Sequence, residues 1–417
     1  MRYWKFAIPL IVILVVVPWL YLIAATDTNN ASADAIIPAS FTVSDVYRVA
    51  QETGAGSINN TAERFGIQGT DLGLMWDNGN GRILMAFGDT YGQGWGQCGA
   101  GPADADWRSN TIAVSSDIDP SDGVTISDMV QDKPGHAKEI IHSLKIDNLE
   151  TTVIPTAGIS VGSRNYLFYM SVSQWYAPGD WYTNYSGVAY SDDGGQNWKV
   201  SPSIRWVNDT FVWKNHFQQA ALVRSGGYVY MFGTPNGRYG DAYLARVPED
   251  KVLEKDSYEY WNGHNWITDV EEAAVPVAVG PVGELSVQFN SFYNRWIMTY
   301  MDENQGSIFI RDAASLTGPW SAPQLLVSGQ AFPQLYGAFL HPWFSDGPEI
   351  YFNMSQWCDQ NVSYNVSLMH ATLSPNPEVQ LAHIPRSRTD IRPPNSIVQS
   401  EPLDTPDRKR SGREKPI

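Results

Sequence analysis

The sequence predicts an all-β fold, a five-bladed β-propeller, preceded by an N-terminal signal peptide or transmembrane anchor. The chain is rich in residues that favour strands and turns, with 16 Trp, 21 Tyr and 35 Gly, and it has few long runs of helix-forming residues. A hairpin unit recurs five times, at intervals of 54 to 83 residues. Repeats of this length, hairpin after hairpin, are typical of propeller blades. A large β-sandwich, the alternative, predicts no such self-similarity.

The N-terminal 33 residues are expected to lie outside the fold. Arg2 and Lys5 precede residues 6–25, which carry no charge and match the length of a bilayer-spanning helix. The small residues Ala31-Ser32-Ala33 offer a cleavage site, so a cleaved signal and a retained anchor both stay open. Basic residues before the span keep that end in the cytoplasm. We therefore expect an exported protein, either secreted or held by this segment at the extracellular face of the cell membrane.

Each repeated unit pairs a short apolar strand with a second strand rich in aromatic residues. The second strands span residues 83–89, 166–172, 228–234, 296–302 and 350–356. The first strands span residues 72–76, 158–161, 220–223, 285–289 and 338–343. We assign residues 43–373 to one propeller domain on this basis. Residues 374–417 are rich in Pro and Arg and lack periodicity, so disorder is expected there.

Two further features bear on the architecture. Residues 191–198 fit the pattern S-x-D-x-G-x-x-W of an Asp-box, a turn whose Ser and Asp bind backbone N–H groups while the Trp packs between blades. The two cysteines, Cys98 and Cys358, come from an early and a late segment. In an exported protein a disulfide between them and two free thiols are both open.

Acidic residues recur at equivalent positions of the units. Asp71 and Glu284 each lie twelve residues before the second strand of their unit, and Asp89 and Asp302 end those second strands. An antiparallel hairpin returns to the edge where it began, so the four carboxylates are expected at one mouth of the channel. Glycoside hydrolysis needs one protonated and one ionised carboxyl group in such a place. A single acid here often only caps a turn, but aligned acids on two blades favour catalysis by Asp71, Asp89 and Glu284.

Other polar and aromatic residues near the strand ends are candidates for substrate binding. Five residues are expected to bind sugar hydroxyls: Asp302, His341, Gln218, Asn184 and Tyr185. Trp175 and Trp357 follow strand ends and offer flat surfaces for sugar rings. Structural hydrogen bonding and packing between blades are the competing roles.

Several classes of function do not fit the sequence. A net charge of −16 argues against nucleic acid as a partner, because phosphate binding needs a basic surface. The chain has no nucleotide-binding loop and no His/Cys spacing typical of a metal site, so no cofactor or metal is expected.

Seven short motifs in a fixed order resemble one known family. They are T-D-L-G at residues 70–73, F-G-D-T at 87–90, W-R-S-N at 107–110, N-Y-S-G at 184–187, F-G-T-P at 232–235, G-E-L-S at 283–286 and Y-M-D-E at 300–303. Together they resemble glycoside hydrolase family 183, actinobacterial exported proteins that were first classed as a domain of unknown function. The resemblance extends from about residue 43 to residue 373.

This resemblance implies a five-bladed propeller with endo-D-arabinofuranase activity on arabinogalactan and lipoarabinomannan of the cell envelope. It also implies catalytic aspartates in the first blade, at Asp71 and Asp89, and Glu284 lies in another family motif. We expect an inverting reaction in which Asp71 is the base, Asp89 the acid or the group that tunes it, and Glu284 the remaining member. The loop of residues 91–100 departs from the family pattern, which leaves linkage preference open. A non-catalytic glycan-binding or envelope-binding propeller and another five-bladed glycosidase, such as an L-arabinanase, are the alternatives.

Overall fold

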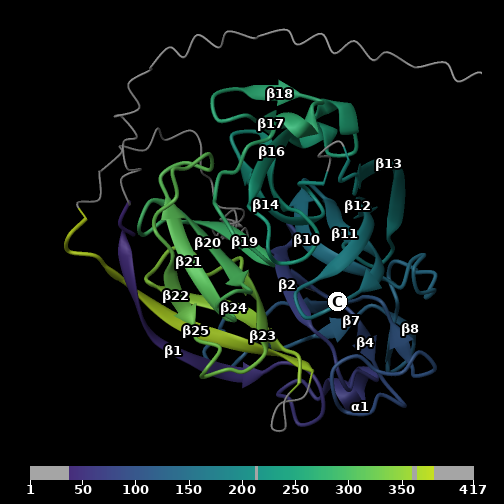
Figure 1. The fold of residues 1–417 in the computed structure, drawn as a ribbon. Coiled ribbons are helices and arrows are strands. Elements are labelled where there is room, and N and C mark those ends of the chain that lie inside the picture. Colours follow the sequence, from purple (N-terminus) through teal and green to yellow (C-terminus); the bar gives the residue numbers. More distant parts are fainter. Residues whose placement is uncertain (1–36, 212–214, 359–363, 380–417) are drawn as a thin grey trace, which may run out of the picture. The chain divides into compact units, whose positions relative to one another are not determined.

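The computed structural model describes residues 37–211, 215–358 and 364–379, and these residues form five antiparallel sheets arranged around a central axis (Figure 1). The predicted all-β, five-bladed propeller is therefore confirmed. The N-terminal segment assigned as a signal or anchor and most of the 374–417 tail lie outside the described residues. No helix within the described ranges is both long and apolar enough to span a membrane.

Each blade has four strands, or five in blade 3, and their order from the axis outwards follows. Blade 1 comprises β2 (Leu72–Asp77), β3 (Ile83–Phe87), β6 (Thr111–Ser115) and β7 (Asp128–Met129). Blade 2 comprises β10 (Thr152–Val161), β11 (Arg164–Trp175), β12 (Trp181–Ser191) and β13 (Lys199–Val207). Blade 3 comprises β14 (Gln219–Ser225), β15 (Tyr228–Thr234), β16 (Tyr243–Pro248), β17 (Glu259–Trp261) and β18 (Trp266–Thr268). Blade 4 comprises β19 (Leu285–Asn290), β20 (Arg295–Asp302), β21 (Ser307–Ala313) and β22 (Gln324–Val327).

Blade 5 is built from both ends of the described chain. Its inner strands are β23 (Leu335–Leu340), β24 (Glu349–Gln356) and β25 (Asn365–Pro375), and its outermost strand is β1 (Phe41–Gln51). β1 runs antiparallel to β25, from the pair Phe41–Pro375 to the pair Gln51–Ser367. The innermost strands contact one another in the order β2, β10, β14, β19 and β23, and β23 contacts β2 again. The ring of blades is thus closed.

Short elements occupy the loops between the blade strands. They are α1 (Thr61–Phe65), the strand pairs β4 (Thr90–Tyr91) with β5 (Trp107–Arg108) and β8 (Gln131–Lys133) with β9 (His136–Ala137), and the 3-10 helices η1 (Glu249–Lys251), η2 (Lys255–Ser257) and η3 (Glu271–Ala273).

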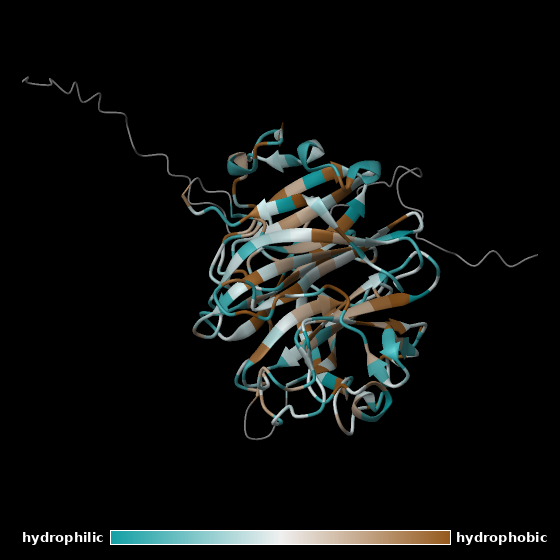
Figure 2. Cartoon of the chain, turned by 90° about the vertical axis from the view of Figure 1, so that its right-hand side faces the viewer, coloured by the Kyte–Doolittle hydropathy of each residue, from teal (hydrophilic) through white to brown (hydrophobic). Residues whose placement is uncertain are grey.

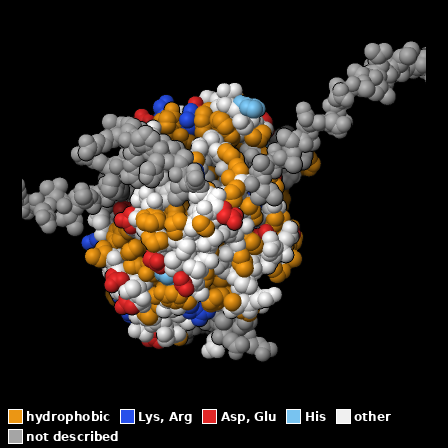
Figure 3. Space-filling model, turned by 90° about the vertical axis from the view of Figure 1, so that its left-hand side faces the viewer, with side chains coloured by type: hydrophobic (Ala, Val, Ile, Leu, Met, Phe, Trp, Pro, Cys, Tyr) orange, Lys and Arg blue, Asp and Glu red, His pale blue; other side chains and the backbone are white. Residues whose placement is uncertain are grey.

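The core lies between adjacent blades. Apolar residues follow the strands, whereas polar residues gather in the connecting loops (Figure 2). Between blades 1 and 2, for example, Trp76 packs against the backbone of Gly158, where a Cβ would lie 2.1 Å from the indole ring. A flat sheet face therefore accepts a large aromatic ring from its neighbour. Figure 3 shows one outer face, where acidic side chains are scattered among apolar ones and basic side chains are sparse.

The Asp-box is confirmed as a structural turn. The Ser191 hydroxyl accepts a hydrogen bond from the Gly195 N–H at 3.0 Å, and the Asp193 carboxylate accepts one from the Asn197 N–H at 2.9 Å. The Trp198 ring meets Trp76 of blade 1 edge-on at 6.3 Å. The turn therefore ties blade 2 to blade 1, as the pattern predicts.

Candidate active site

The predicted carboxylates lie at one end of the blade strands. Asp71 immediately precedes β2 and Asp89 follows β3, and β2 and β3 pair from Leu72–Phe87 onwards. In blade 4, Glu284 precedes β19 and Asp302 ends β20. The charges of Asp89 and Glu284 both act on Asp71. The structure therefore brings Asp71, Asp89 and Glu284 together across two blades.

The backbone around Asp71 is held in an unusual conformation. Leu72 has a φ of 66°, in the left-handed region that a bulky residue rarely adopts, and Gly73 follows with 67°. The pairing of β2 with β3 is interrupted between Leu72 and Leu74, so a bulge lies directly beside the carboxylate. Bulges re-aim side chains and are common next to active sites. Strain of this kind persists only where the surrounding structure enforces it, which marks Asp71 as a functional candidate.

The carboxyl group of Asp71 is packed tightly. A Cβ on Gly88 would lie 2.4 Å from Asp71 Oδ1, so the F-G-D-T motif needs glycine at this position to admit the carboxyl. The Tyr336 hydroxyl donates to Asp71 Oδ2 at 2.9 Å. Oδ1 is buried and has no hydrogen-bond partner within the described part of the chain. Burial, followed by the charge of Asp89, raises the pKa of Asp71 to about 7, while the hydroxyl groups of Tyr336 and Tyr364 oppose the rise.

Asp89 has a different environment. Its Oδ1 accepts hydrogen bonds from Trp107 Nε1 at 2.8 Å and from the Thr152 hydroxyl at 2.6 Å. Burial raises the pKa of Asp89 to about 6, while these two donors and the charge of Lys145 oppose the rise. Burial and the two hydrogen-bond donors therefore act on the pKa of Asp89 in opposite directions.

Glu284 forms a buried ion pair that the sequence analysis did not anticipate. Arg238, in the loop between β15 and β16, donates to both carboxylate oxygens of Glu284, with Nη2 to Oε1 at 2.8 Å and Nε to Oε2 at 2.9 Å. Its Nη1 donates to Glu303 at 3.1 Å. Burial alone lowers the pKa of Arg238, but the neighbouring Glu284 raises it above the ordinary value. The Glu284 side chain is thus held in place by the Arg238 guanidinium.

The Arg238 guanidinium also connects this ion pair to Asp71. It lies over the Tyr336 ring, 4.9 Å from the ring centroid, and Tyr336 donates to Asp71. A Cβ on Gly283 would lie 2.9 Å from Arg238 Cγ, so the G-E-L-S motif leaves space for the arginine stem. Glu284, Arg238, Tyr336 and Asp71 therefore form one continuous network.

Asp302 lies at the same end of blade 4 as Glu284, but its carboxylate binds a neighbouring residue of its own turn. Oδ1 accepts the Gln305 backbone N–H and Oδ2 accepts the Gln305 side-chain amide, both at 3.1 Å. This arrangement caps the turn between β20 and β21. The next residue, Glu303, is the one that faces the Arg238 cluster.

Two of the polar candidates make structural hydrogen bonds. Gln218 is fully buried; its Oε1 accepts from the Thr183 hydroxyl at 2.8 Å and its Nε2 donates to the Trp206 carbonyl at 3.0 Å. Asn184 donates to the Leu149 carbonyl at 2.7 Å. Gln218 fastens blade 3 to blade 2, and Asn184 fastens β12 to the loop before β10.

The aromatic candidates differ in their exposure. Tyr185 is half-buried, packed edge-on against Tyr169 and under the Arg205 guanidinium at 4.2 Å. Trp175, at the end of β11, and Trp357, just after β24, are 42% and 44% exposed. Both tryptophans lie at strand ends on the carboxylate side, so both remain candidates for stacking on sugar rings.

His341 lies apart from these residues. It follows the last residue of β23, at the opposite end of the strand from the carboxylates. It is buried against Phe344, with ring centroids 4.8 Å apart, and burial lowers its pKa to about 3. The structure does not bring His341 to the other site residues.

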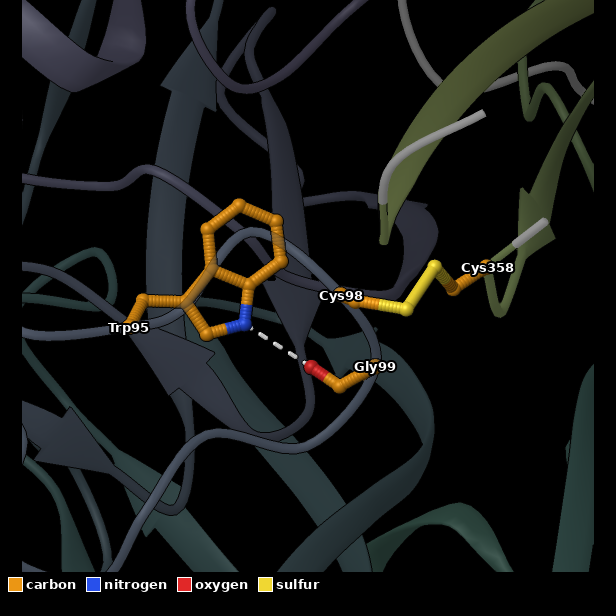
Figure 4. The surroundings of a disulfide bond; sticks show 4 residues. All are labelled: Trp95, Cys98, Gly99 and Cys358. Carbon is orange, nitrogen blue, oxygen red and sulfur yellow. Dashed lines mark hydrogen bonds between the residues drawn. A yellow bond between two sulfur atoms is a disulfide. The ribbon is translucent and has the colours of Figure 1, made fainter. Parts of the chain in front are cut away.

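The cysteine pair is joined by a disulfide next to the site. Cys98 and Cys358 are bonded, with Cα atoms 5.4 Å apart across 260 residues of sequence (Figure 4). Trp95 Nε1 donates to the Gly99 carbonyl at 2.8 Å, and a Cβ on Gly99 would lie 2.8 Å from the Trp357 ring. The bond thus fastens the loop of residues 92–106 in blade 1 to the end of β24 in blade 5.

Sequence reasoning missed the partners of the carboxylates, namely Arg238, Tyr336, Trp107, Thr152 and Glu303. Trp107 and Glu303 belong to two of the family motifs, W-R-S-N and Y-M-D-E, but the sequence alone indicated no role for either residue. Arg238 lies in a loop, where the repeat alignment gives no position. The only sequence signal for Arg238 is the glycine on either side of it in N-G-R-Y-G.

No three His, Cys, Asp or Glu side chains gather to hold a metal ion in the residues that the structure covers.

Comparison with known proteins identifies the family. The family model described as "Domain of unknown function (DUF4185)" matches residues 56–370. Notoamide biosynthesis cluster protein J of Aspergillus sp. (strain MF297-2) is 31% identical over 321 residues, which is 72% of this chain and 83% of that protein.

Two solved structures are similar to this chain at low sequence identity. A Bacteroides ovatus protein provisionally described as a hydrolase is 12% identical, with a TM-score of 0.54 over 79% of this chain and 93% of its own. A family 117 glycoside hydrolase of Zobellia galactanivorans is 11% identical, with a TM-score of 0.46 over 82% of this chain and 93% of its own. The first likeness is one of fold alone. The family match covers most of the chain, and the chain belongs to the DUF4185 family.

Proposed function

We propose that this protein is a glycoside hydrolase that cleaves an arabinan-type polysaccharide of the cell envelope, such as arabinogalactan or lipoarabinomannan, outside the cell. The observation that carries the proposal is the pair Asp71 and Asp89, two buried carboxyl groups with raised pKa values at one end of the propeller. Enzymes tune carboxyl groups in this way for proton transfer near neutral pH. The motifs that resemble endo-D-arabinofuranases include both aspartates.

The environments of the two aspartates favour different roles. Asp71 is buried and lies near the charges of Asp89 and Glu284, which favour its protonated form, so we assign it as the group that retains a proton and donates it to the leaving oxygen. Asp89 accepts two hydrogen bonds, which favour its ionised form and suit a base that activates water. This assignment reverses the roles expected from the sequence. The reaction remains proposed as inverting.

Glu284 is assigned a supporting role in this scheme. Its charge raises the pKa of Asp71, and its ion pair with Arg238 keeps that charge fixed. A carboxylate that accepts both guanidinium N–H groups is a poor proton donor. We therefore propose that Glu284 tunes the acid.

The disulfide supports export. Disulfides persist in oxidising compartments and are rare in the cytosol. The bond between Cys98 and Cys358 is consistent with a protein that crosses the membrane, as the apolar segment of residues 6–25 predicts.

The test is to incubate the purified protein with arabinogalactan and measure released oligosaccharides. Asp71→Asn and Asp89→Asn are expected to lower kcat by at least about 100-fold, because the amide keeps the shape but transfers no proton. Asp250→Asn, an exposed aspartate in η1, is the matched control and should keep the wild-type rate.

The products separate the alternatives. Cleavage of an L-arabinan but not of arabinogalactan would reassign the enzyme to another class of five-bladed glycosidase. Binding of arabinogalactan without cleavage by the wild type would make the protein a glycan-binding propeller. Wild-type rates in both Asn variants would remove Asp71 and Asp89 from catalysis.

A further inference from the structure

An exposed aromatic surface adjoins the carboxylate cluster. Three rings, those of Trp175, Tyr176 and Tyr239, are 42%, 56% and 54% exposed. They surround the turn between β11 and β12, with Tyr239 contributed by the β15–β16 loop. We call these three residues the aromatic platform. All three are Trp or Tyr, whose rings combine an apolar face with a polar edge.

Hydrogen bonds and ring packing hold the turn that carries Trp175 and Tyr176. Tyr176 N–H donates to the Asp180 carbonyl at 3.0 Å, which closes the turn, and the Trp175 ring packs edge-on against Trp181 at 5.4 Å. Asn236, from the β15–β16 loop, donates to the Trp181 carbonyl at 2.6 Å. A rigid surface loses little conformational entropy when it binds, so its exposed rings favour a ligand.

Direct contacts connect the platform to the proposed catalytic network. The Arg238 N–H donates to the Gly179 carbonyl at 3.0 Å. A Cβ on Gly179 would lie 2.6 Å from the Glu303 carboxyl carbon, and Glu303 pairs with Arg238. The turn that carries Trp175 and Tyr176 therefore rests on the same arginine that binds Glu284.

We infer that the aromatic platform is a distal subsite for the polysaccharide, binding sugar residues beyond the bond that is cleaved. The inference rests on the proposed function, and it adds a place where a long chain gains affinity that a short one lacks. Sugar rings present apolar C–H faces to aromatic rings and hydroxyl groups to neighbouring acceptors. The exposed Asp180 offers such an acceptor beside Tyr176.

The kinetic test uses a Trp175→Ala/Tyr176→Ala double variant. Its kcat/KM is measured on arabinogalactan and on the shortest arabino-oligosaccharide that the wild type cleaves. The ratio of the two values, polymer over oligosaccharide, is expected to fall about tenfold. Phe292→Ala is the matched control, because Phe292 is 54% exposed but lies in the β19–β20 turn, at the other end of blade 4. A ratio within twofold of wild type in the double variant would overturn the inference.

A binding test separates this inference from the proposed function. Asp89→Asn protein, with and without the double substitution, is run in gels containing arabinogalactan. Retention of Asp89→Asn and its loss in the combined variant would support the subsite, even if the wild type cleaved no arabinogalactan and the proposed activity failed. Equal retention of both proteins, or no retention of Asp89→Asn itself, would overturn it.

Discussion

At the scale of single residues, the pKa of Asp71 depends on burial, on neighbouring charges and on the hydroxyl groups of Tyr336 and Tyr364. Burial and the charges of Asp89 and Glu284 raise the pKa of Asp71, and the hydroxyl groups of Tyr336 and Tyr364 oppose them because they stabilise the ionised carboxylate. The balance leaves the pKa at about 7. Asp71 therefore changes its protonation state near neutral pH, where general acid–base catalysis is effective.

Tyr336→Phe is expected to shift the pH dependence of activity. Loss of the donor raises the pKa of Asp71 further, by about one unit. If Asp71 is the acid, activity falls as pH rises through this pKa, so the alkaline limb of kcat/KM moves to higher pH. The measurement is kcat/KM on arabinogalactan between about pH 4 and about pH 10, taken about every half pH unit.

The same profile distinguishes the two possible roles of Asp71. A shift of the acidic limb to higher pH would make Asp71 the base, as the sequence analysis expected. A profile unchanged from wild type would remove Asp71 from both roles. Tyr351→Phe, a half-buried tyrosine of β24 packed against His370, serves as the control.

Residue positions were more predictable than the directions of side chains. The repeat alignment located Asp71 and Asp302 correctly at one end of their blades, because strand pairing fixes where the backbone goes. The Asp302 carboxylate turns instead to Gln305, while Glu303 faces Arg238. The direction of a side chain depends on contacts between blades, and the sequence of a single repeat unit does not show those contacts.

At the scale of elements, the loop of residues 92–106 is the part of the site that depends most on a covalent bond. It joins β4 to β5 and contains no blade strand. A disulfide joins Cys98 of this loop to Cys358, which follows β24, and the Trp95 side chain of the same loop is buried. Trp107, which directly follows this loop, donates a hydrogen bond to Asp89. The position of the loop therefore affects the position of a proposed catalytic residue.

Removing the disulfide is expected to destabilise the protein and loosen this loop. A Cys98→Ser/Cys358→Ser variant should lose about 2–4 kcal/mol of unfolding free energy, since the bond constrains the unfolded chain. Denaturant unfolding measures the loss, and limited proteolysis should show new cleavage within residues 92–106. Wild-type protein treated with a thiol reductant should behave like the variant. Equal stability of oxidised and reduced wild type would show that the blades alone hold the loop.

Elements inside the repeat were predictable, whereas the element that closes it was not. Each inner hairpin was located from its own apolar pattern. β1 carries the sequence F-T-V-S-D-V-Y-R-V-A-Q, which reads as a strand but has no hairpin partner next to it in sequence. Its partner, β25, lies more than 300 residues away, and only the closed ring brings the two together.

At the scale of the whole molecule, β1 decides whether the propeller is complete. Without it, blade 5 would end at β25, a long strand with an open edge, and such edges promote aggregation. Phe41 and Ala50 of β1 are buried, so β1 also contributes to the core between blades. The first and last strands of the described chain therefore stabilise each other through one sheet.

A circular permutant isolates this contribution. Phe41 pairs with Pro375, and the Asn376 N–H donates to the Ser40 carbonyl at 2.9 Å, so a short linker suffices to make β25 and β1 a hairpin. New termini would be opened between Gly263 and His264, in the exposed turn that joins β17 and β18. Exposed turns with small and polar residues tolerate such breaks.

The permutant is expected to fold with a Tm within about 5 °C of wild type and to keep the proposed activity on arabinogalactan, because every strand pair of blade 5 is preserved. The comparison is a chain lacking residues 1–52, which retains the carboxylates and the disulfide but not β1. That chain should aggregate or unfold at much lower temperature, since both the edge of β25 and the side chains beneath β1 become exposed. Light scattering and thermal unfolding measure both proteins. A truncated chain as stable and soluble as the permutant would show that four complete blades and the three remaining strands of blade 5 suffice, and that β1 only covers an edge that tolerates water.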